Sequence, residues 1–382
     1  MTVMLSEEQR EFAAAVREFC RREVGTREQR DKLTDCGREG HSLELNRRIA
    51  ELGWAAINVP EEYGGAGGNH VDLCVLLEEL HRGLAPVPWH GTTLITAGIY
   101  TRFASEELKR KVLGRLAEGA ALSIAMSEPE AGSDVAALSC RAERRGGGWV
   151  INGQKTWITN AHQADSILLI ARTERGEKKH HGLTMFHVPA DTPGLAVKGI
   201  DTLNGTEVND LYFSDCELPA ESVVGEVGQG WAQLMPGLAT ERLILAAQML
   251  GVAERAFDDA LAFVSERTQF GERVGSYQAI KHRIADLATE IECTRLLVYS
   301  VAHRADAGDD PQGLARASSM AKLKATEVAK NTALEGMQMM GGYGYSTEFD
   351  MVQHVRAALG ATIYGGTNEI QRDIIGNSFG LR

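Results

Sequence analysis

The sequence predicts an α+β protein of three successive domains: an N-terminal all-α domain over residues 1–119, a small β-barrel or sandwich domain over 120–226, and a C-terminal helical bundle over 227–382. Three observations predict this order. Apolar residues recur at helical spacing at both ends of the chain, short β-rich runs crowd its middle, and no helical pattern alternates with those runs. A chain of 382 residues is long enough for two or three domains with large cores.

The N-terminal domain is predicted from helix-start signals and helical spacing. Ser6 followed by Gln9 has the spacing of a capping box, and Phe12, Val16 and Phe19 then recur at intervals of four and three, which gives one apolar face. Three further helical patterns cover residues 43–53, 71–84 and 108–116. A loop rich in proline and glycine, residues 58–68, separates two of them.

The middle domain is predicted from short runs of β-forming residues. These runs cover residues 122–126, 149–152, 166–171, 183–188 and 211–213. Turn signals separate them, and two of these are the glycine triplet at 146–148 and the pair Asn152-Gly153, which is typical of a two-residue hairpin turn. Because no helix alternates with the runs, a parallel βαβ sheet is disfavoured.

The C-terminal domain is predicted from two long helical patterns. The first steps by four and three over three heptads, as expected of a bundle helix, through Ile280, Ile284, Leu287, Ile291, Thr294, Val298 and Val301. The second covers residues 314–340 and is rich in alanine, lysine and methionine.

Charge and composition exclude several classes of function. Forty basic and 52 acidic residues give a net charge of −12, and no long basic run exists, so binding to nucleic acid or to an anionic membrane is disfavoured. No stretch approaches 18 apolar residues, and the first 19 residues lack the character of a signal or transit peptide. Six widely spaced cysteines predict reduced thiols and no metal site, and a cytoplasmic location follows.

Glycine is over-represented, with 41 residues, yet neither standard phosphate-binding loop is present. No GxGxxG follows a strand and no GxxxxGK[ST] occurs, so each glycine cluster taken alone is better explained as a turn. The segment AMSEPEAGSD (125–134) has small hydrogen-bonding residues suited to a phosphate or a ring edge, although taken alone it is better explained as a simple turn. In QKTWITN (154–160), Trp157 taken alone is better explained as a core residue.

Six segments in order nevertheless resemble the acyl-CoA dehydrogenase family, and the resemblance covers essentially the whole chain. They are EEYGG (61–65), AMSEPEAGSD (125–134), NGQKTWITN (152–160), ERTQFG (266–271), QMMGGYGY (338–345) and IYGGTNEIQR (363–372). The resemblance implies a helical domain, a β domain and a C-terminal four-helix bundle. It also implies a homotetramer, built as a pair of dimers, that binds FAD non-covalently across a subunit interface.

The resemblance also implies which residues bind FAD. Trp157 would stack on the isoalloxazine, the Thr159 hydroxyl would approach N5, Ser133 would lie near the pyrophosphate, and Arg267 and Gln269 would reach the FAD of a neighbouring subunit. Arginine suits such phosphate contacts because its guanidinium binds two oxygens at once. The full set of cofactor-binding residues is Met126, Ser127, Gly132, Ser133, Trp157, Ile158, Thr159, Arg267, Gln269, Phe270, Gln278, Gln338, Gly341, Gly342, Thr367 and Glu369.

The implied reaction is α,β-dehydrogenation of an acyl-CoA thioester to the trans-2-enoyl-CoA, with a carboxylate as base and flavin N5 as hydride acceptor. In many members the carboxylate precedes the Gly-Thr of the last segment, where this chain has Gly365. A subset typified by isovaleryl-CoA dehydrogenase carries the glutamate on the first long C-terminal helix, and Glu241 matches that position. The alternative role of Glu241 is a helix N-terminal carboxylate that compensates the helix dipole.

The residues expected at the substrate are Ser133, Arg242, Tyr364, Gly365 and Gly366, with the Gly365 N–H polarising the thioester oxygen. The moved base favours a branched, cyclic or otherwise bulky acyl group, with residues 89–100 and 243–250 as candidate pocket floor. A basic turn at 178–181 is either a contact for CoA phosphates or a solvated loop.

An electron-transferring flavoprotein is the expected oxidant. A flavin oxidase or monooxygenase on the same fold, a carrier-protein thioester as substrate, and a non-catalytic subunit of a mixed tetramer stay open as alternatives.

Overall fold

The computed structural model describes residues 5–381, apart from the side chain of Pro236. The chain divides into two compact units. The bundle unit comprises the described parts of 1–29, 69–85 and 239–382, and the sheet unit comprises 30–68 and 86–238. The three-domain boundaries drawn from the sequence stay a prediction, whereas the order helices, sheet, helices along the chain is observed.

Helices dominate the bundle unit. Its elements are α1 (Glu7–Val24), α4 (His70–Arg82), β9 (Thr268–Gln269), β10 (Glu272–Arg273), η4 (Val274–Ser276), α8 (Gln278–Asp306), α9 (Pro311–Met340), α10 (Gly342–Tyr345), α11 (Met351–Ala361) and α12 (Asn368–Ser378). Two helices, α2 (Arg27–Leu33) and α7 (Gly230–Glu266), begin in one unit and end in the other.

The sheet unit contains one eight-stranded sheet with short helices. Its elements are α3 (Leu43–Glu51), η1 (Glu61–Tyr63), α5 (His90–Phe103), α6 (Glu106–Ala117), β1 (Leu122–Ala125), η2 (Val135–Ala137), β2 (Arg141–Arg145), β3 (Gly148–Thr159), β4 (Ser166–Arg172), β5 (Leu183–Pro189), β6 (Leu195–Thr202), β7 (Gly205–Leu218), η3 (Ala220–Ser222) and β8 (Val223–Val224).

The predicted helix start at Ser6 is confirmed. The Ser6 Oγ accepts a hydrogen bond from the Gln9 N–H at 3.1 Å, and the Gln9 Oε1 accepts one from the Ser6 N–H at 3.1 Å. This reciprocal pair satisfies two of the backbone donors that a helix N-terminus leaves free. Within α1, Val16 and Phe19 are buried, as their spacing predicts.

The sheet is mostly antiparallel, as expected without helical crossovers. Its strand order is β6-β7-β3-β2-β4-β5-β8, and β1 pairs with β4. Only the β1–β4 and β2–β4 pairs among the described strands are parallel. The sequence underestimates two strands, because β3 and β7 continue far beyond the predicted runs.

The predicted turn at Asn152-Gly153 is wrong. Both residues lie inside β3, where the pairing with β7 shifts register between Ile151 and Gly153. A Cβ at Gly153 would lie 2.8 Å from the Cα of Cys140. Gly153 therefore marks a β-bulge at which two backbone segments lie close together. A glycine in the sequence can indicate such a bulge as well as a turn.

Two apolar clusters form the core of the sheet unit. One joins α5 and α6 to the sheet and includes Tyr100, Leu113 and Leu168. The other lies around Trp149 and Phe186, whose rings meet edge to face with centroids 5.2 Å apart. Side chains of alternating direction on the same strands supply both clusters, since successive strand residues point to opposite faces.

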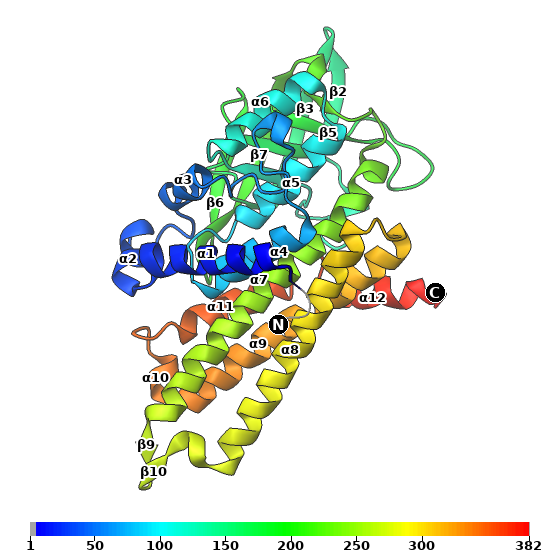
Figure 1. Cartoon of the computed structure of the whole chain (residues 1–382). Helices are drawn as coiled ribbons and strands as arrows, with labels where there is room; N and C mark the ends of the chain where they lie inside the picture. The colour runs from blue at the N-terminus through cyan, green and yellow to red at the C-terminus, as the bar shows by residue number, and fades with distance from the viewer. Residues whose placement is uncertain (1–4, 382) are drawn as a thin grey trace. The chain divides into compact units, whose positions relative to one another are not determined.

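The bundle unit is built on long helices that pack along one another. Figure 1 shows α8 and α9 side by side, and α9 also contacts α11 and α12. The apolar stripe predicted on α8 is buried from Leu287 onward, whereas Ile280 and Ile284 stay partly exposed. The stripe therefore extends beyond the part of α8 that is buried in this chain.

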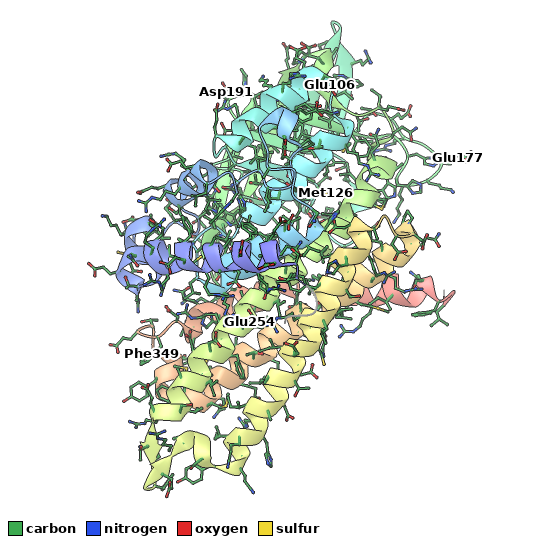
Figure 2. All side chains as sticks on the ribbon, in the orientation of Figure 1. Glu106, Met126, Glu177, Asp191, Glu254 and Phe349 are labelled. Carbon is green, nitrogen blue, oxygen red and sulfur yellow. The ribbon has the colours of Figure 1, made fainter. Side chains whose placement is uncertain are left out.

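Buried charges join three helices of the bundle unit. Glu254, labelled in Figure 2, is buried on α7 and forms an ion pair with Arg295 of α8. Glu78 of α4 accepts a 2.6 Å hydrogen bond from the Tyr299 hydroxyl, and burial raises the pKa of Glu78 to about 7. Buried charges of this kind need such partners to offset their lost hydration.

Two further expectations concern cysteines and membranes. All six cysteines are free, four of them buried and two exposed, and no disulfide joins them. Over the described residues, none of the helices has the length and apolarity needed to cross a bilayer.

Candidate active site

Helix α7 carries Glu241 and Arg242 on a mainly apolar stretch. The residues that follow, Leu243 and Ile244, are fully buried, while Glu241 itself is only partly buried. Because α7 begins at Gly230, Glu241 lies about three turns into the helix. A carboxylate compensates the helix dipole only within the first turn of a helix. Glu241 lies well beyond the first turn of α7, so this explanation does not apply to it.

A tight turn faces this part of α7. Gly365 and Gly366 both have left-handed backbone angles, with φ of +64° and +77°. Two successive left-handed residues are tolerated here because glycine lacks a Cβ. Thr367 then caps α12, since its Oγ1 accepts a hydrogen bond from the Ile370 N–H at 3.3 Å.

The turn and the helix meet at Gly365. A Cβ placed on Gly365 would lie 2.1 Å from the Cδ1 of Leu245, far closer than carbon atoms that are not bonded approach each other, so one of the two would have to move. The same Cβ position lies 3.8 Å from the Oε1 of Glu241. The carboxylate of Glu241 therefore lies beside the space that a side chain at position 365 would enter.

Opposing effects act on the Glu241 carboxyl. Burial raises its pKa above the usual range, whereas the charges of Arg242 and Lys322 lower it. Arg242 lies next to Glu241 in the chain, and burial lowers the pKa of its guanidinium. A carboxyl whose pKa is raised by burial is a better proton acceptor near neutral pH than an exposed one.

Lys322 of α9 is the third charged group here, and sequence reasoning missed it. Its side chain is fully buried, and its Nζ donates to the Gly366 carbonyl at 2.9 Å and to the Asn368 Oδ1 at 3.1 Å. Gln371 adds bonds from its Nε2 to the carbonyls of Gly365 at 3.1 Å and Gly366 at 2.9 Å. The side chains of Lys322 and Gln371 thus hold the backbone carbonyls of the turn.

The segment 125–134 is held in the same way within the sheet unit. Met126, labelled in Figure 2, follows β1, and its carbonyl accepts a 2.8 Å hydrogen bond from the Nζ of Lys155. Lys155 is fully buried and also forms an ion pair with Glu128 at 2.8 Å. Glu128 accepts three more hydrogen bonds, from the Ser139 N–H and hydroxyl and from the Cys140 N–H.

These contacts fix the backbone of the segment while leaving Gly132 and Ser133 exposed. No atom lies within 4 Å of a Cβ placed on Gly132. The segment therefore presents small, exposed residues on its open side. That arrangement suits a ligand that approaches the main chain closely.

A bulge in β3 turns Trp157 outward. The pairing with β7 shifts between Lys155 and Ile158, and Trp157 has φ of +60°, which is rare for a bulky residue. Its side chain is 60% exposed, so the alternative of a core tryptophan is wrong. The Thr156 N–H bonds the Ser127 carbonyl at 3.0 Å, which joins the bulge to the segment 125–134.

The neighbours of Trp157 lie differently. Ile158 is buried in the core of the sheet unit, so only its backbone faces the bulge. Thr159 is partly exposed, and its carbonyl accepts a 2.6 Å hydrogen bond from the Ser123 hydroxyl.

The hairpin formed by β9 and β10 presents Phe270 at its tip. Phe270 and Gly271 are the two turn residues, and both have positive φ, +55° and +85°. This pattern is that of a type I′ turn, in which asparagine and glycine are the favoured residues. The Phe270 side chain is 97% exposed in a conformation that costs free energy.

Close to the base of that hairpin, Arg267 lies over the ring of Tyr343 with its Cζ 5.4 Å from the ring centroid. Tyr343 is near Gly341 and Gly342, where no atom lies within 4 Å of an added Cβ. Gly341 also has φ of +60° and ψ of −137°, angles that favour glycine. Gln269, Gln278 and Gln338 are exposed on the same unit.

The predicted residues thus fall into two sets. The sheet unit holds Met126, Ser127, Gly132, Ser133, Trp157, Ile158 and Thr159, and the bundle unit holds Glu241, Arg242, Arg267, Gln269, Phe270, Gln278, Gln338, Gly341, Gly342, Tyr364, Gly365, Gly366, Thr367 and Glu369. Within the sheet unit, the segment 125–134 and the bulge at Trp157 are joined by a hydrogen bond. Within the bundle unit, Glu241 lies beside Gly365, and Arg267 lies over Tyr343.

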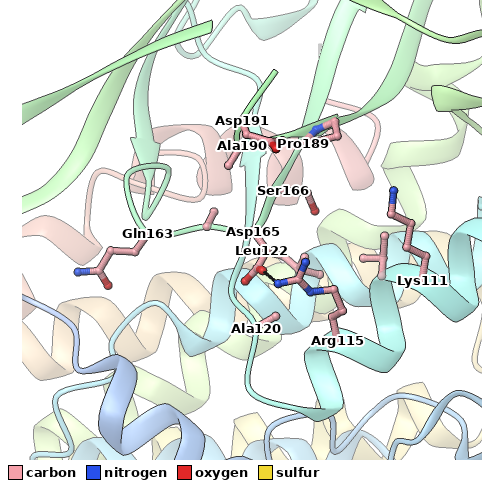
Figure 3. A pocket seen from close by; sticks show the side chains of 12 residues that line it. Lys111, Arg115, Ala120, Leu122, Gln163, Asp165, Ser166, Pro189, Ala190 and Asp191 are labelled. Carbon is pink, nitrogen blue, oxygen red and sulfur yellow. Dashed lines mark hydrogen bonds and ion pairs between the residues drawn. The ribbon is translucent and has the colours of Figure 1, made fainter. Parts of the chain in front are cut away.

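A separate hollow of about 590 Å³ lies in the sheet unit, shown in Figure 3. It lies between α6, which supplies Lys111 and Arg115, and the strand ends near Asp165 and Asp191. Arg115 and Asp165 form an ion pair within it. None of the predicted site residues lines this hollow.

The basic turn at 178–181 is anchored rather than free. Lys179 forms an ion pair with Asp134 at 2.5 Å, and Arg172 donates to the carbonyls of Lys179 at 2.9 Å and His181 at 2.8 Å. The turn therefore lies next to the segment 125–134. Whether it contacts CoA phosphates stays a prediction.

Comparisons with known proteins agree with this geometry. Three family models match: the acyl-CoA dehydrogenase N-terminal domain over residues 6–120, the middle domain over 123–216 and the C-terminal domain over 228–380. The chain is 35% identical to the probable acyl-CoA dehydrogenase fadE25 of Mycobacterium tuberculosis, over 97% of this chain and 95% of that protein. It is 33% identical to the mitochondrial isovaleryl-CoA dehydrogenase of Solanum tuberosum, over 98% of this chain and 91% of that protein.

Solved structures are similar over the whole length. The acyl-CoA dehydrogenase from Geobacillus kaustophilus matches with a TM-score of 0.92 and 33% identity, covering 99% of each chain. A glutaryl-CoA dehydrogenase from Mycobacterium smegmatis in complex with FADH2 matches with a TM-score of 0.89 and 27% identity, covering 98% of this chain and 95% of that one.

Fold and matched domains together define an FAD-dependent oxidoreductase of three domains. The chain belongs to the acyl-CoA dehydrogenase family, whose activity is the dehydrogenation of an acyl-CoA. The predicted fold class, with its β domain between helical domains and its C-terminal helical bundle, is confirmed. FAD as cofactor also fits the residues present, because the exposed Trp157, the open Gly132 and the exposed Arg267 offer a stacking surface, close backbone approach and a cation.

Proposed function

We propose that Glu241 is the base that removes the α-proton of an acyl-CoA thioester, giving the trans-2-enoyl-CoA. One observation carries the proposal: the Oε1 of Glu241 lies 3.8 Å from the position that a Cβ at Gly365 would take. A carboxylate on α7 would therefore reach the same region as the carboxylate that many family members carry at the position of residue 365. In the observed rotamer, the Cδ1 of Leu245 lies where a side chain at position 365 would begin, which agrees with a base on α7 rather than at residue 365.

The surrounding groups suit that role. Burial raises the pKa of Glu241 above its usual range, which makes its carboxylate a stronger base than an exposed one. The Gly365 N–H is proposed to donate to the thioester oxygen, which acidifies the α-carbon by stabilising the developing negative charge. Arg242 is proposed to order the thioester end of the substrate, together with Ser133, Tyr364 and Gly366.

FAD, when bound, supplies the acceptor for the hydride that leaves the β carbon. In the sheet unit, Trp157 would stack against the ring, and Ser127, Ser133 and Thr159 would donate to polar atoms. In the bundle unit, Arg267 and Gln269 would hold phosphate and adenosine groups. The position of Phe270, exposed and strained at a hairpin tip, supports a contact outside its own subunit.

That contact belongs to the proposed quaternary structure, a homotetramer of two dimers. An electron-transferring flavoprotein is proposed as the oxidant of the reduced enzyme. A cytoplasmic location and a place in fatty-acid or branched-chain acyl catabolism stay predictions, as does the preference for a branched, cyclic or bulky acyl group. Size-exclusion chromatography with light scattering would distinguish the tetramer from smaller assemblies.

The test of the base is Glu241→Gln, which keeps the size of the side chain and removes its basicity. The variant is expected to purify yellow with its FAD and to show no bleaching when acyl-CoA is added without oxygen. The exposed Glu8 of α1 provides the control, and Glu8→Gln is expected to bleach at the wild-type rate. Bleaching of Glu241→Gln at near the wild-type rate would refute the assignment.

A panel of straight, branched and cyclic acyl-CoAs, and one acyl carrier-protein thioester, defines the substrate in the same assay. Rapid oxygen consumption by the reduced protein would instead indicate an oxidase or monooxygenase. A protein that purifies colourless and binds no added FAD would indicate a non-catalytic subunit.

A further inference from the structure

Lys322 is an unusual residue for its position. It lies on α9 between Ala321 and Ala325, both fully buried, and is itself fully buried. Removing an ammonium group from water is costly unless hydrogen bonds replace its hydration. A lysine maintained inside an alanine-rich helix surface therefore needs an explanation beyond packing.

The contacts of Lys322 converge on one turn. Its Nζ reaches the Gly366 carbonyl and the Asn368 Oδ1, both of which belong to the turn that precedes α12. Asn368 is itself fixed by the Thr326 hydroxyl, whose Oγ1 lies 3.0 Å from its Oδ1. Lys322 thus connects α9 by a hydrogen bond to the turn that contains the Gly365 N–H.

Lys322 also acts on Glu241 through its charge. The pKa of Lys322 is lowered to about 8 by burial, while the negative charges of Glu241 and Glu369 oppose that effect and Arg242 adds to it. The reciprocal influence lowers the pKa of Glu241, against the effect of burial. The charged groups around Glu241 are therefore Arg242 on its own helix and Lys322 on α9, with Glu369 of α12 acting on Lys322.

We propose that Lys322 is a positioning residue for the reaction: it fixes the Gly365–Gly366 turn beside Glu241, and its positive charge favours the ionised form of Glu241. This role rests on the proposed function of Glu241. The two parts of the role can be separated, because Gln371 also bonds the Gly366 carbonyl, and the Gly365 carbonyl as well, without carrying a charge.

Three variants test the proposal. Lys322→Met removes both the bonds and the charge with little change in volume, Lys322→Arg keeps the charge, and Gln371→Leu removes bonds to the turn while leaving the charge. For each, the steady-state kcat and KM are measured against pH. In addition, the infrared C=O stretch of Glu241 is titrated in the protein without substrate, with Glu241→Gln as the difference reference.

Lys322→Met is expected to lower kcat at least tenfold and to move the Glu241 titration and the acidic limb of the rate profile to higher pH by about one unit, since an opposing charge is lost. Lys322→Arg is expected to restore the position of the limb. Gln371→Leu is expected to lower kcat without shifting the acidic limb of the pH–rate profile. If Lys322→Met does not fold, Lys322→Gln replaces it as the neutral variant.

A folded, FAD-loaded neutral variant whose Glu241 titrates as in the wild type would overturn the proposal. So would a kcat unchanged in both the neutral variant and Gln371→Leu. Because the infrared titration needs no turnover, it reports on Lys322 even if Glu241→Gln proves active. Failure of the proposed base and failure of the lysine's role are therefore distinguishable.

Discussion

Two features of Gly365 disfavour a side chain at this position. Its backbone is left-handed, and a Cβ would lie 2.1 Å from Leu245. We predict that Gly365→Ala lowers the free energy of unfolding by about 2 to 4 kcal/mol, from backbone strain and overpacking together. Urea unfolding monitored by circular dichroism measures the change.

The control for that prediction is Gly376→Ala in α12, because no atom lies within 4 Å of a Cβ there. Alanine is the better helix former, so this variant is expected to be neutral or more stable by up to about 1 kcal/mol. Equal stabilities for the two variants would contradict the steric argument. A double variant with Leu245→Ala should recover part of the loss at Gly365.

Lys155 and Glu128 form a buried pair whose parts depend on each other. Their atoms lie 2.8 Å apart, and the positive charge and hydrogen bonds hold the pKa of Glu128 below its usual value against the effect of burial. Lys155→Met is predicted to cost about 3 to 5 kcal/mol, because it leaves a buried carboxylate unpaired. It should also reduce the FAD content, since the Met126 carbonyl loses its donor.

The double variant Glu128→Gln with Lys155→Met also removes the negative charge of Glu128, which Lys155→Met alone leaves without its cation. It is expected to be more stable than Lys155→Met alone, in a double-mutant cycle followed by urea unfolding. A double variant that is less stable than the single one would show that the charge is not the cause.

The β9–β10 hairpin combines a local cost with a proposed functional gain. Asparagine adopts the left-handed conformation more readily than phenylalanine, so Phe270→Asn is predicted to leave the melting temperature of the FAD-free, unassembled chain unchanged or higher. The same change removes the exposed ring and should lower the FAD content and weaken assembly. Leu203→Asn, which also removes an exposed apolar side chain, is the control and should keep its FAD.

Sequence patterns predict some elements well and miss others for physical reasons. Capping and heptad spacing identify α1 and α8, because each has one buried face. Helix α5 was missed since it is buried on nearly all sides and has no periodic pattern, and the strand β6 was missed since most of its residues are exposed. Strand β2 is mainly charged, so only its pairing with β3 reveals it.

The site shows a similar division. Glu241, Gly365 and Trp157 could be singled out from motifs and their order along the chain. Lys155 and Lys322 could not, because no local pattern distinguishes a buried lysine from an exposed one. Only the three-dimensional structure places their ammonium groups against the carbonyls of Met126 and Gly366.

Buried neutral histidines make the stability of the whole protein depend on pH. Burial lowers the pKa of His41 to about 3 and those of His81 and His187 to about 4, from 6.5. Between pH 6.5 and pH 4 the unfolded chain therefore binds more protons than the folded one. The free energy of unfolding is predicted to fall in this range by about 3 kcal/mol or more, as measured by urea unfolding at several pH values.

His41 offers the most direct check, since its ring stacks on Trp89 at 4.9 Å with both planes nearly parallel. His41→Leu replaces it with a side chain that does not titrate. The variant should lose about 2 kcal/mol less than the wild type between pH 7 and pH 4.5. An identical fall in both proteins would mean that His41 does not contribute.

The two buried lysines have a consequence for how this protein can change. Lys155 and Lys322 each donate from the interior to a backbone carbonyl of a loop in the proposed site, so one hydrogen bond that holds each loop does not involve the residues that point outward. Mutations on the outer surface can then alter which acyl group is accepted while the two loops keep their form. On the proposed function, the capacity of this architecture to acquire new substrates would thus depend in part on two side chains buried beneath the site.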